Sequence, residues 1–197
     1  GSRGAAKVER LDFRPTTANQ RRISRSRLLS SAALFEFAEG ELRFAAREDG
    51  QPHVLASELA RQASARGAPD QALRHIKGVF ADYLSTPYEA APAEFWRLAF
   101  PLPFRRSLER YAKIHRLDLY LLAGLIRQES EFNVRAVSRA NARGLMQVLP
   151  SVGRSLARTL KTGAFRTSML FSADYNIRLG TYYFRFLLDQ LDGFEEA

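Results

Sequence analysis

The 197-residue sequence predicts a mainly α-helical protein in two parts, a short segment of helical hairpins followed by a larger helical domain. Apolar residues recur at helical spacing through residues 28–84 and again after residue 104. Between these regions, residues 85–103 contain four prolines, a density that no regular helix tolerates. The hydrophobic content of 46% can supply a real core.

Residues 1–27 are predicted to be a basic and flexible leader. Arginines cluster in it at Arg21, Arg22, Arg25 and Arg27, and such charge runs are usually solvated. With a net charge of +9, the chain favours an anionic partner such as nucleic acid, a membrane surface or an acidic polymer. Nucleic acid is the weak alternative, because the leader has one aromatic residue to stack on bases and no nucleic-acid-binding motif follows.

Residues 28–84 are predicted to form two consecutive helix pairs. The first pair is expected to break at Gly40. The second is expected to begin at Pro52, because proline is tolerated in a first helical turn, and to break at Gly67, with Asp70 near the start of the last helix. Two such pairs are similar in style to tetratricopeptide-like superhelical repeats, which could hold a protein partner.

Residues 85–103 are predicted to be a linker at a domain boundary. The prolines surround a group of aromatic residues, of which Trp96 and Phe100 are expected to pack the two halves of the chain together. Stacking of Trp96 on a sugar is the less favoured alternative, because aromatic residues commonly anchor interfaces.

Residues 104–197 are predicted to form the second domain. One helix is expected from Phe104 to His115, and Asp118 is well placed to cap the next. A late helix is expected because a further set of residues shares one helical face: Ile177, Gly180, Phe184, Leu187, Leu188 and Leu191.

The helix after Asp118 carries the residue that suggests chemistry. At 100° per residue, Glu129 falls within about 20° of Leu122 and about 40° of Leu125, on the apolar face of the helix. Desolvation there disfavours the charged carboxylate, and a protonated glutamic acid near neutral pH is what general-acid cleavage of a glycosidic bond requires. The alternative, equally favoured by the pattern, is a buried glutamate paired to one of three arginines: Arg135, Arg139 or Arg143.

The residues after Glu129 favour a cleft. A small polar loop, residues 138–143, precedes Gly144-Leu145-Met146-Gln147. Glycine allows a close approach of chain or ligand, methionine offers a pliable apolar surface, and glutamine offers both donors and an acceptor to a polar substrate.

The sequence does not indicate a metal site, a cysteine nucleophile, a transmembrane helix or a signal peptide. The chain has no cysteine, and its three histidines show no ligand spacing, so neither a metal nor a thiolate nucleophile is expected. No apolar run is long enough to predict a transmembrane helix, and the first residues lack the apolar segment of a signal peptide.

The sequence around Glu129 resembles a known family. QESEFN, which begins at Gln128, and AVSRANARGLMQVLPS, which begins at Ala136, are similar to the catalytic core of the soluble lytic transglycosylases, the SLT family of the lysozyme-like fold. Glu129-Ser130 stands at the family's catalytic Glu-Ser pair, and residues 144–147 reproduce its GLMQ motif. Asn176-Ile177 with Gly180 and Tyr183 looks like its Asn-Ile-x-x-Gly-x-x-Tyr segment. The resemblance covers residues 103–197 and extends weakly, through the helical hairpins, to residue 28.

The resemblance implies a lytic transglycosylase that acts on peptidoglycan glycan strands in the periplasm or bacterial cell envelope, without a cofactor. Glu129 would protonate the leaving oxygen between N-acetylmuramic acid and N-acetylglucosamine, then act as base on the sugar's own 6-hydroxyl, giving a 1,6-anhydromuramoyl end. Most glycosidases need two carboxylates, whereas Glu131 and Asp118 are poorly placed as partners for Glu129. Asn176 would support a loop of the cleft. The expected substrate-binding residues are Ser130, Ser138, Gly144, Leu145, Met146 and Gln147.

The chain departs from the family pattern at its end. Family members continue with an Ala-Tyr-Asn-Ala-Gly segment whose tyrosine lines the cleft, whereas this sequence stops at Ala197. A truncated chain, with one wall of the cleft missing and weak or no activity, is therefore expected. The alternatives are a non-catalytic module that binds peptidoglycan or serves as a scaffold, and a muramidase that hydrolyses the same bond with water.

Overall fold

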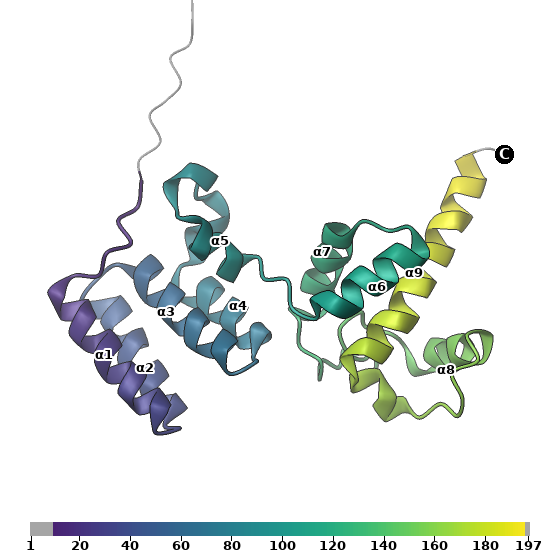
Figure 1. The fold of residues 1–197 in the computed structure, drawn as a ribbon, viewed down its shortest axis with the longest axis horizontal. Coiled ribbons are helices and arrows are strands. Elements are labelled where there is room, and N and C mark those ends of the chain that lie inside the picture. Colours follow the sequence, from purple (N-terminus) through teal and green to yellow (C-terminus); the bar gives the residue numbers. More distant parts are fainter. Residues whose placement is uncertain (1–9, 196–197) are drawn as a thin grey trace, which may run out of the picture. The chain divides into compact units, whose positions relative to one another are not determined.

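The computed structural model describes residues 10–195, with side chains described up to residue 191, and the chain divides into two compact units (Figure 1). The first unit is Gly1–Pro101 and the second is Leu102–Ala197. Every regular element of the described residues is helical, and two isolated bridges, Val137 to Arg143 and Arg143 to Val148, are the β-type pairings found there. The predicted mainly α-helical class is confirmed.

The first unit consists of helical hairpins. Its elements are α1 (Thr17–Ser31), α2 (Phe35–Glu48), α3 (Pro52–Ala65), α4 (Pro69–Val79), the 3-10 helices η1 (Ala81–Ser85) and η2 (Tyr88–Ala90), and α5 (Ala93–Ala99). In Figure 1, α1 lies against α2 and α3 against α4, and α2 also packs on α3. Proline begins both α3 and α4, where its missing N–H breaks no helical bond.

The prediction of a flexible leader is wrong for residues 17–27, which belong to α1. Thr16 caps this helix by accepting a hydrogen bond from the Asn19 N–H at 3.2 Å, and Ile23 is 4% exposed in the core. Carboxylates of other helices pair with arginines that were expected to be solvated: Arg22 and Arg25 lie 3.0 and 3.1 Å from Glu41. Residues 1–9 of the predicted leader lie outside the described residues.

The expected break at Gly40 is also wrong. Gly40 lies inside α2, and the chain turns earlier, between the end of α1 and the start of α2, where Ala33 has a φ of 60°. The Leu34 N–H closes this turn by donating to the Leu29 carbonyl at 2.9 Å.

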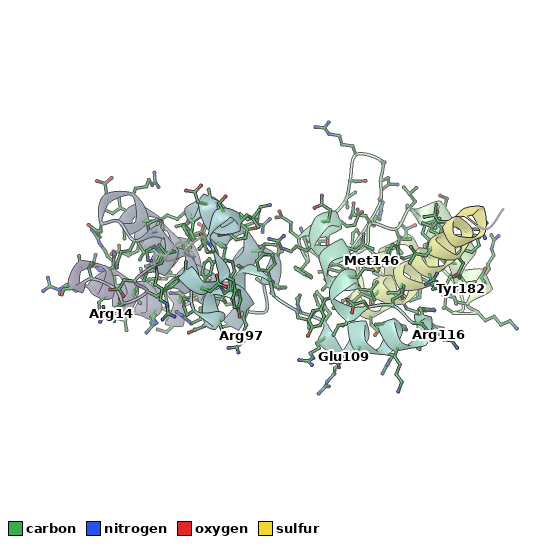
Figure 2. The ribbon with its side chains drawn as sticks, turned by 90° about the horizontal axis from the view of Figure 1, so that it is seen from above. Arg14, Arg97, Glu109, Arg116, Met146 and Tyr182 are labelled. Carbon is green, nitrogen blue, oxygen red and sulfur yellow. The ribbon has the colours of Figure 1, made fainter. Side chains whose placement is uncertain are left out.

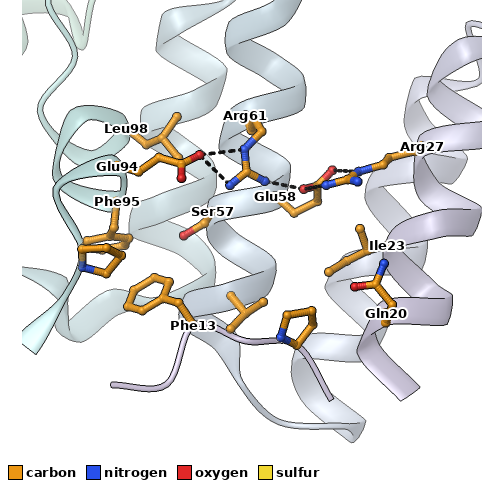
Figure 3. A pocket seen from close by; sticks show the side chains of 13 residues that line it. Phe13, Gln20, Ile23, Arg27, Ser57, Glu58, Arg61, Glu94, Phe95 and Leu98 are labelled. Atoms are coloured by element: carbon orange, nitrogen blue, oxygen red, sulfur yellow. Dashed lines mark hydrogen bonds and ion pairs between the residues drawn. The ribbon is translucent and has the colours of Figure 1, made fainter. Parts of the chain in front are cut away.

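The buried carboxylate of Glu58 links helices α1, α3 and α5 through its ion pairs with two arginines (Figure 3). Glu58 of α3 is 2% exposed and accepts two 2.8 Å hydrogen bonds from Arg27 of α1. Arg61 lies between Glu58 and Glu94 of α5. Burial raises the pKa of Glu58, but hydrogen bonds from Arg27 and Gln62 and the nearby guanidinium charges outweigh burial and lower it overall. These side chains form one wall of a cavity of about 290 Å³, with Phe13 and Phe95 opposite.

The predicted linker, residues 85–103, is instead largely part of the first unit. Phe95 of α5 is 1% exposed, and its ring lies 5.4 Å from Phe13 and 5.7 Å from Phe80. The ring neighbours of Trp96 are likewise within this unit, at Phe95, Tyr88 and Phe100. The prolines allow two short helices separated by extended backbone, so a proline-rich segment packs instead of joining domains loosely.

The second unit is built around its last helix. Its elements are α6 (Arg105–His115), α7 (Leu119–Ser130), α8 (Pro150–Thr159), η3 (Thr167–Phe171) and α9 (Ala173–Glu195). Helix α6 packs along α9, and α8 and η3 pack on other parts of α9. Asp174 ties α9 to α6 by accepting hydrogen bonds from the Ser107 and Tyr111 hydroxyls at 2.7 and 3.1 Å.

The expected cap of α7 is present. The Asp118 carboxylate accepts a 2.8 Å hydrogen bond from the Leu121 N–H. From this cap the helix runs through the fully buried Leu122 and Ile126 to Ser130. No helix of the described residues has the length and apolarity needed to span a membrane.

Candidate active site

Glu129 lies in the last turn of α7 and lines an open cavity of about 270 Å³. Leu125, one turn earlier, lies on the same wall. The other walls come from the loop that carries Met146 and Gln147, and from the face of α9 that includes Gly180. The structure therefore brings together three segments that are separate in the sequence: the end of α7, residues 146–152 and the middle of α9.

The expectation that Glu129 is buried on an apolar face is wrong, because its side chain is exposed at the cavity. The alternative of a buried ion pair is not observed either. Among the described residues, no arginine or lysine forms an ion pair with Glu129, and Arg143 instead donates to the Asn141 side chain at 2.9 and 3.2 Å. The carboxylate is thus accessible both to solvent and to a ligand in the cavity.

Ser130 follows Glu129 and connects α7 to the loop. Its hydroxyl lies 2.8 Å from the Leu145 carbonyl oxygen and 3.1 Å from the Ile126 carbonyl oxygen. Since the hydroxyl has one hydrogen to donate, and protein carbonyls already surround it, this geometry favours positioning of the loop over substrate binding.

Asn176 holds the same loop from the other side. Its side chain is 0% exposed, its Oδ1 accepts from the Met146 N–H at 2.8 Å, and its Nδ2 donates to the carbonyls of Arg143 and Leu170, both at 2.9 Å. One amide therefore fixes the start of α9, the end of η3 and the backbone that leads into the cavity wall. This is the geometry expected of a residue that supports the cleft.

Gly144 and Leu145 contribute packing and not cavity surface. Gly144 is buried with a φ of +73°, and a Cβ at this position would collide with the Leu170 carbonyl oxygen and the Asn176 side chain. Leu145 is 0% exposed in the core. Both residues were expected to bind substrate, but the structure places neither on the cavity.

Met146 and Gln147 do line the cavity. Figure 2 shows Met146 beside the long helix α9, where the absence of a side chain at Gly180 lets the two segments approach: a Cβ on Gly180 would lie 2.5 Å from the Met146 sulfur. The Gln147 Nε2 donates to the Gly144 carbonyl at 2.9 Å. This bond orients the amide and leaves its Oε1 as an acceptor for a ligand, with no donor to it among the described residues.

Ser138 is not at the cavity. Its Oγ accepts from the Ala142 N–H at 3.1 Å, and its own N–H donates to the Ala142 carbonyl at 3.0 Å. The side chain therefore closes a tight turn in the polar loop, and the expected substrate contact of Ser138 is not found.

Four residues of α9 were missed as cavity residues: Gly180, Tyr183, Phe184 and Leu187. The pattern of the late helix was interpreted as a core face, because Gly180, Phe184 and Leu187 recur at helical spacing. The feature of this helix that could have indicated a site was Tyr183, which lies next to the apolar residues. Tyrosine combines an apolar ring with a polar hydroxyl and is enriched at binding interfaces.

The second carboxylates considered for catalysis do not line the cavity. Asp118 caps the opposite end of α7, and Glu131 follows the helix in a left-handed conformation with a φ of 51°. Among the described residues, Glu129 is the acidic side chain on the cavity wall. No cluster of His, Asp or Glu in the described part of the chain could hold a metal ion.

Residues 106–197 match the family described as Transglycosylase SLT domain. Two curated relatives are both described as membrane-bound lytic murein transglycosylase C. The protein of Haemophilus influenzae (strain PittGG) is 35% identical over 126 residues, which are 62% of this chain and 34% of the relative. That of Actinobacillus succinogenes is 40% identical over 84 residues, 42% of this chain and 23% of the relative. The chain thus spans about a third or less of these relatives.

Solved structures extend the likeness to both units. Lytic transglycosylase Slt from Pseudomonas aeruginosa, an inactive mutant, has a TM-score of 0.66 and 26% identity, covering 91% of this chain and 29% of that one. The 70 kDa soluble lytic transglycosylase of Escherichia coli has a TM-score of 0.63 and 19% identity, covering 95% and 29%. The predicted order, helical hairpins followed by a lysozyme-like transglycosylase domain, is confirmed.

Proposed function

We propose that the protein is a peptidoglycan lytic transglycosylase and that Glu129 is its catalytic acid. The observation that carries this proposal is the unpaired, exposed carboxylate of Glu129 on the wall of an apolar cavity, at the end of a fixed helix. The names of the relatives support murein, the bacterial cell-wall glycan, as the substrate and the cell envelope as the location.

In the proposed reaction, Glu129 donates its proton to the glycosidic oxygen that leaves from N-acetylmuramic acid. The resulting carboxylate then takes the proton of the sugar's own 6-hydroxyl, whose oxygen attacks the anomeric carbon and closes a 1,6-anhydro ring. This sequence uses one acid that becomes a base, which suits a cavity wall with one carboxylate, whereas a hydrolytic glycosidase usually needs two. Neither a metal nor an organic cofactor is needed.

The neighbours of Glu129 have separate proposed tasks. Met146 provides apolar surface for a sugar face, and the Gln147 Oε1 accepts a hydrogen bond from a hydroxyl or amide of the glycan. Ser130 and Asn176 position the loop that holds both residues. Substrate binding by Ser138, Gly144 and Leu145 is not proposed, because the structure uses these residues for packing and turns.

The test is Glu129→Gln in the full-length protein, assayed on purified cell-wall sacculi with mass spectrometry of the products. Glutamine keeps the shape but cannot donate the proton, so release of anhydro-muropeptides should fall by at least about 100-fold. The Pseudomonas aeruginosa structure is likewise described as an inactive glutamate-to-glutamine mutant. Glu131→Gln, two residues along, is the matched control and should retain activity.

Three outcomes would contradict the proposal. Unchanged product release by Glu129→Gln would remove Glu129 from the chemistry. Products heavier by one water molecule would identify a muramidase. Binding of sacculi with no release by the unsubstituted protein would favour a non-catalytic binding or scaffolding module.

A further inference from the structure

The first unit exposes a group of aromatic and apolar side chains that are distinct from the residues of the candidate active site. This aromatic platform surrounds a shallow cavity of about 360 Å³. Its lining residues are Tyr83, Leu84, Thr86, Tyr88, Trp96 and Phe100. None of the six carries a charge, so the cavity offers apolar surface and not an ion-binding site.

The rings of the platform are held in place before any ligand binds. The Trp96 indole N–H donates to the Tyr88 carbonyl at 2.9 Å, which satisfies its polar group. The Tyr88 ring stacks on Trp96 at 5.8 Å with an interplanar angle of 21°, and Phe100 continues the row at 6.1 Å and 33°. Behind them the edge contact of Trp96 with the buried Phe95, at 5.0 Å, fixes the indole to the core. Binding here would therefore cost little side-chain entropy.

The platform is nevertheless open to solvent. Tyr88 is 65% exposed, Leu84 67% and Phe100 47%. Large apolar side chains that are exposed next to one another commonly mark a binding surface, whereas single ones need no explanation. Because the lining residues include neither lysine nor arginine, a phosphate-bearing partner such as nucleic acid or an anionic lipid is disfavoured.

We propose that the aromatic platform is a second glycan-binding site, which holds sugar rings of a strand by stacking, apart from the cavity at Glu129. The choice of a glycan rests on the proposed function, since a transglycosylase acts on a polymer of linked sugar rings. A pyranose ring has an apolar face of C–H groups and a polar rim, and that face fits a neutral aromatic ring. A row of two nearly parallel rings followed by a third suits successive sugars of a strand.

Trp96 reports on this site directly, because it is the only tryptophan of the chain. The experiment titrates the full-length protein with the β-1,4-linked tetramer of N-acetylglucosamine and follows tryptophan emission. Stacking of a sugar on the platform should change the emission saturably and should reduce quenching by acrylamide. The effect should persist in Glu129→Gln, in which cleavage is removed, so a failure of the proposed function would be seen separately in product release.

A matched pair of substitutions locates the signal. Tyr88→Leu keeps an apolar side chain but removes the outer ring, and should weaken tetramer binding by about fivefold, the equivalent of about 1 kcal/mol for one stacked ring. Tyr120→Leu makes the same change at a tyrosine that is 73% exposed in the second unit, and should leave binding unchanged. Tyr88→Phe retains the ring and should bind like the unsubstituted protein. Release of anhydro-products from a short soluble glycan should be unchanged in all three variants.

Several results would overturn the inference. One is an emission that does not change up to millimolar tetramer, and another is a change of equal size in Tyr88→Leu. A third is a Trp96 that acrylamide cannot reach without ligand, together with a loss of thermal stability in Tyr88→Leu, because this would show that another part of the protein covers the platform.

Discussion

Gly144→Ala is the sharpest test of how the cavity wall is built. The new methyl group would point at the Leu170 carbonyl oxygen and the Asn176 side chain, and the residue would keep a φ of +73°. Gly163 provides the matched control: its φ is +88°, but a Cβ there would meet nothing within 4 Å. Gly163→Ala therefore measures backbone strain alone, and Gly144→Ala measures strain plus collision.

The expected magnitudes follow from the groups that must move. Strain at a left-handed position costs about 1–2 kcal/mol for alanine, and this is the whole cost expected for Gly163→Ala. At Gly144 the Asn176 amide must also shift, which breaks its 2.9 Å hydrogen bonds to the Arg143 and Leu170 carbonyls. Each buried group left unpaired costs about 1–3 kcal/mol, so Gly144→Ala should lower the free energy of unfolding of the second unit by at least about 3 kcal/mol.

The two units can be followed separately in one denaturation experiment. Trp96, the only tryptophan, lies in the first unit, so its fluorescence reports the unfolding of that unit, whereas far-ultraviolet circular dichroism reports both. Gly144→Ala should move the circular-dichroism transition without moving the fluorescence transition. Equal stability losses in the Gly144 and Gly163 variants would refute the reasoning, because the collision would then contribute nothing.

Other substitutions test individual buried groups. Asn176→Ala leaves three backbone groups unpaired and should lower the free energy of unfolding of the second unit by about 3–5 kcal/mol. Asn133→Ala, in the loop, should lower it by less than about 1 kcal/mol. Similar losses for the two variants in urea unfolding would contradict this reasoning. Glu58→Ala should destabilise the first unit by about 2–4 kcal/mol, because Glu58 is buried. The Glu94 side chain is 64% exposed, so Glu94→Ala should destabilise the unit by less than about 1 kcal/mol. A larger loss for Glu94→Ala than for Glu58→Ala would refute the role of Glu58. Burial lowers the pKa of His75 below 6.5, so the unfolded chain binds more protons than the folded one at low pH. The stability of the first unit should therefore fall as the pH drops below about 6.5. If the dependence of stability on pH is unchanged in His75→Gln, this group is excluded as the cause. The charged groups that surround His75 are Glu39, Arg43, Arg66 and Arg74.

The sequence predicted a helix boundary well where the residue that fixes the boundary lies next to it in the chain. Pro52 begins α3 and Asp118 caps α7, because a proline ring or a capping carboxylate acts within one helical turn. The prediction of a flexible basic leader was wrong for the opposite reason. Whether Arg22 and Arg27 form ion pairs depends on Glu41 and Glu58, which come from later helices and are brought close only when the chain folds.

Glu129 shows the same limit at the candidate site. The helical angle correctly puts it beside Leu125, and both residues line one cavity. The angle says nothing about position along the helix axis, however. Leu122 and Ile126, in the middle of α7, are 0% exposed, whereas Glu129 in the last turn is exposed. This difference matters for the proposed chemistry, because an acid sealed in the core could not reach a bond inside a long glycan strand. An acid at the open end of a buried helix is both fixed and accessible.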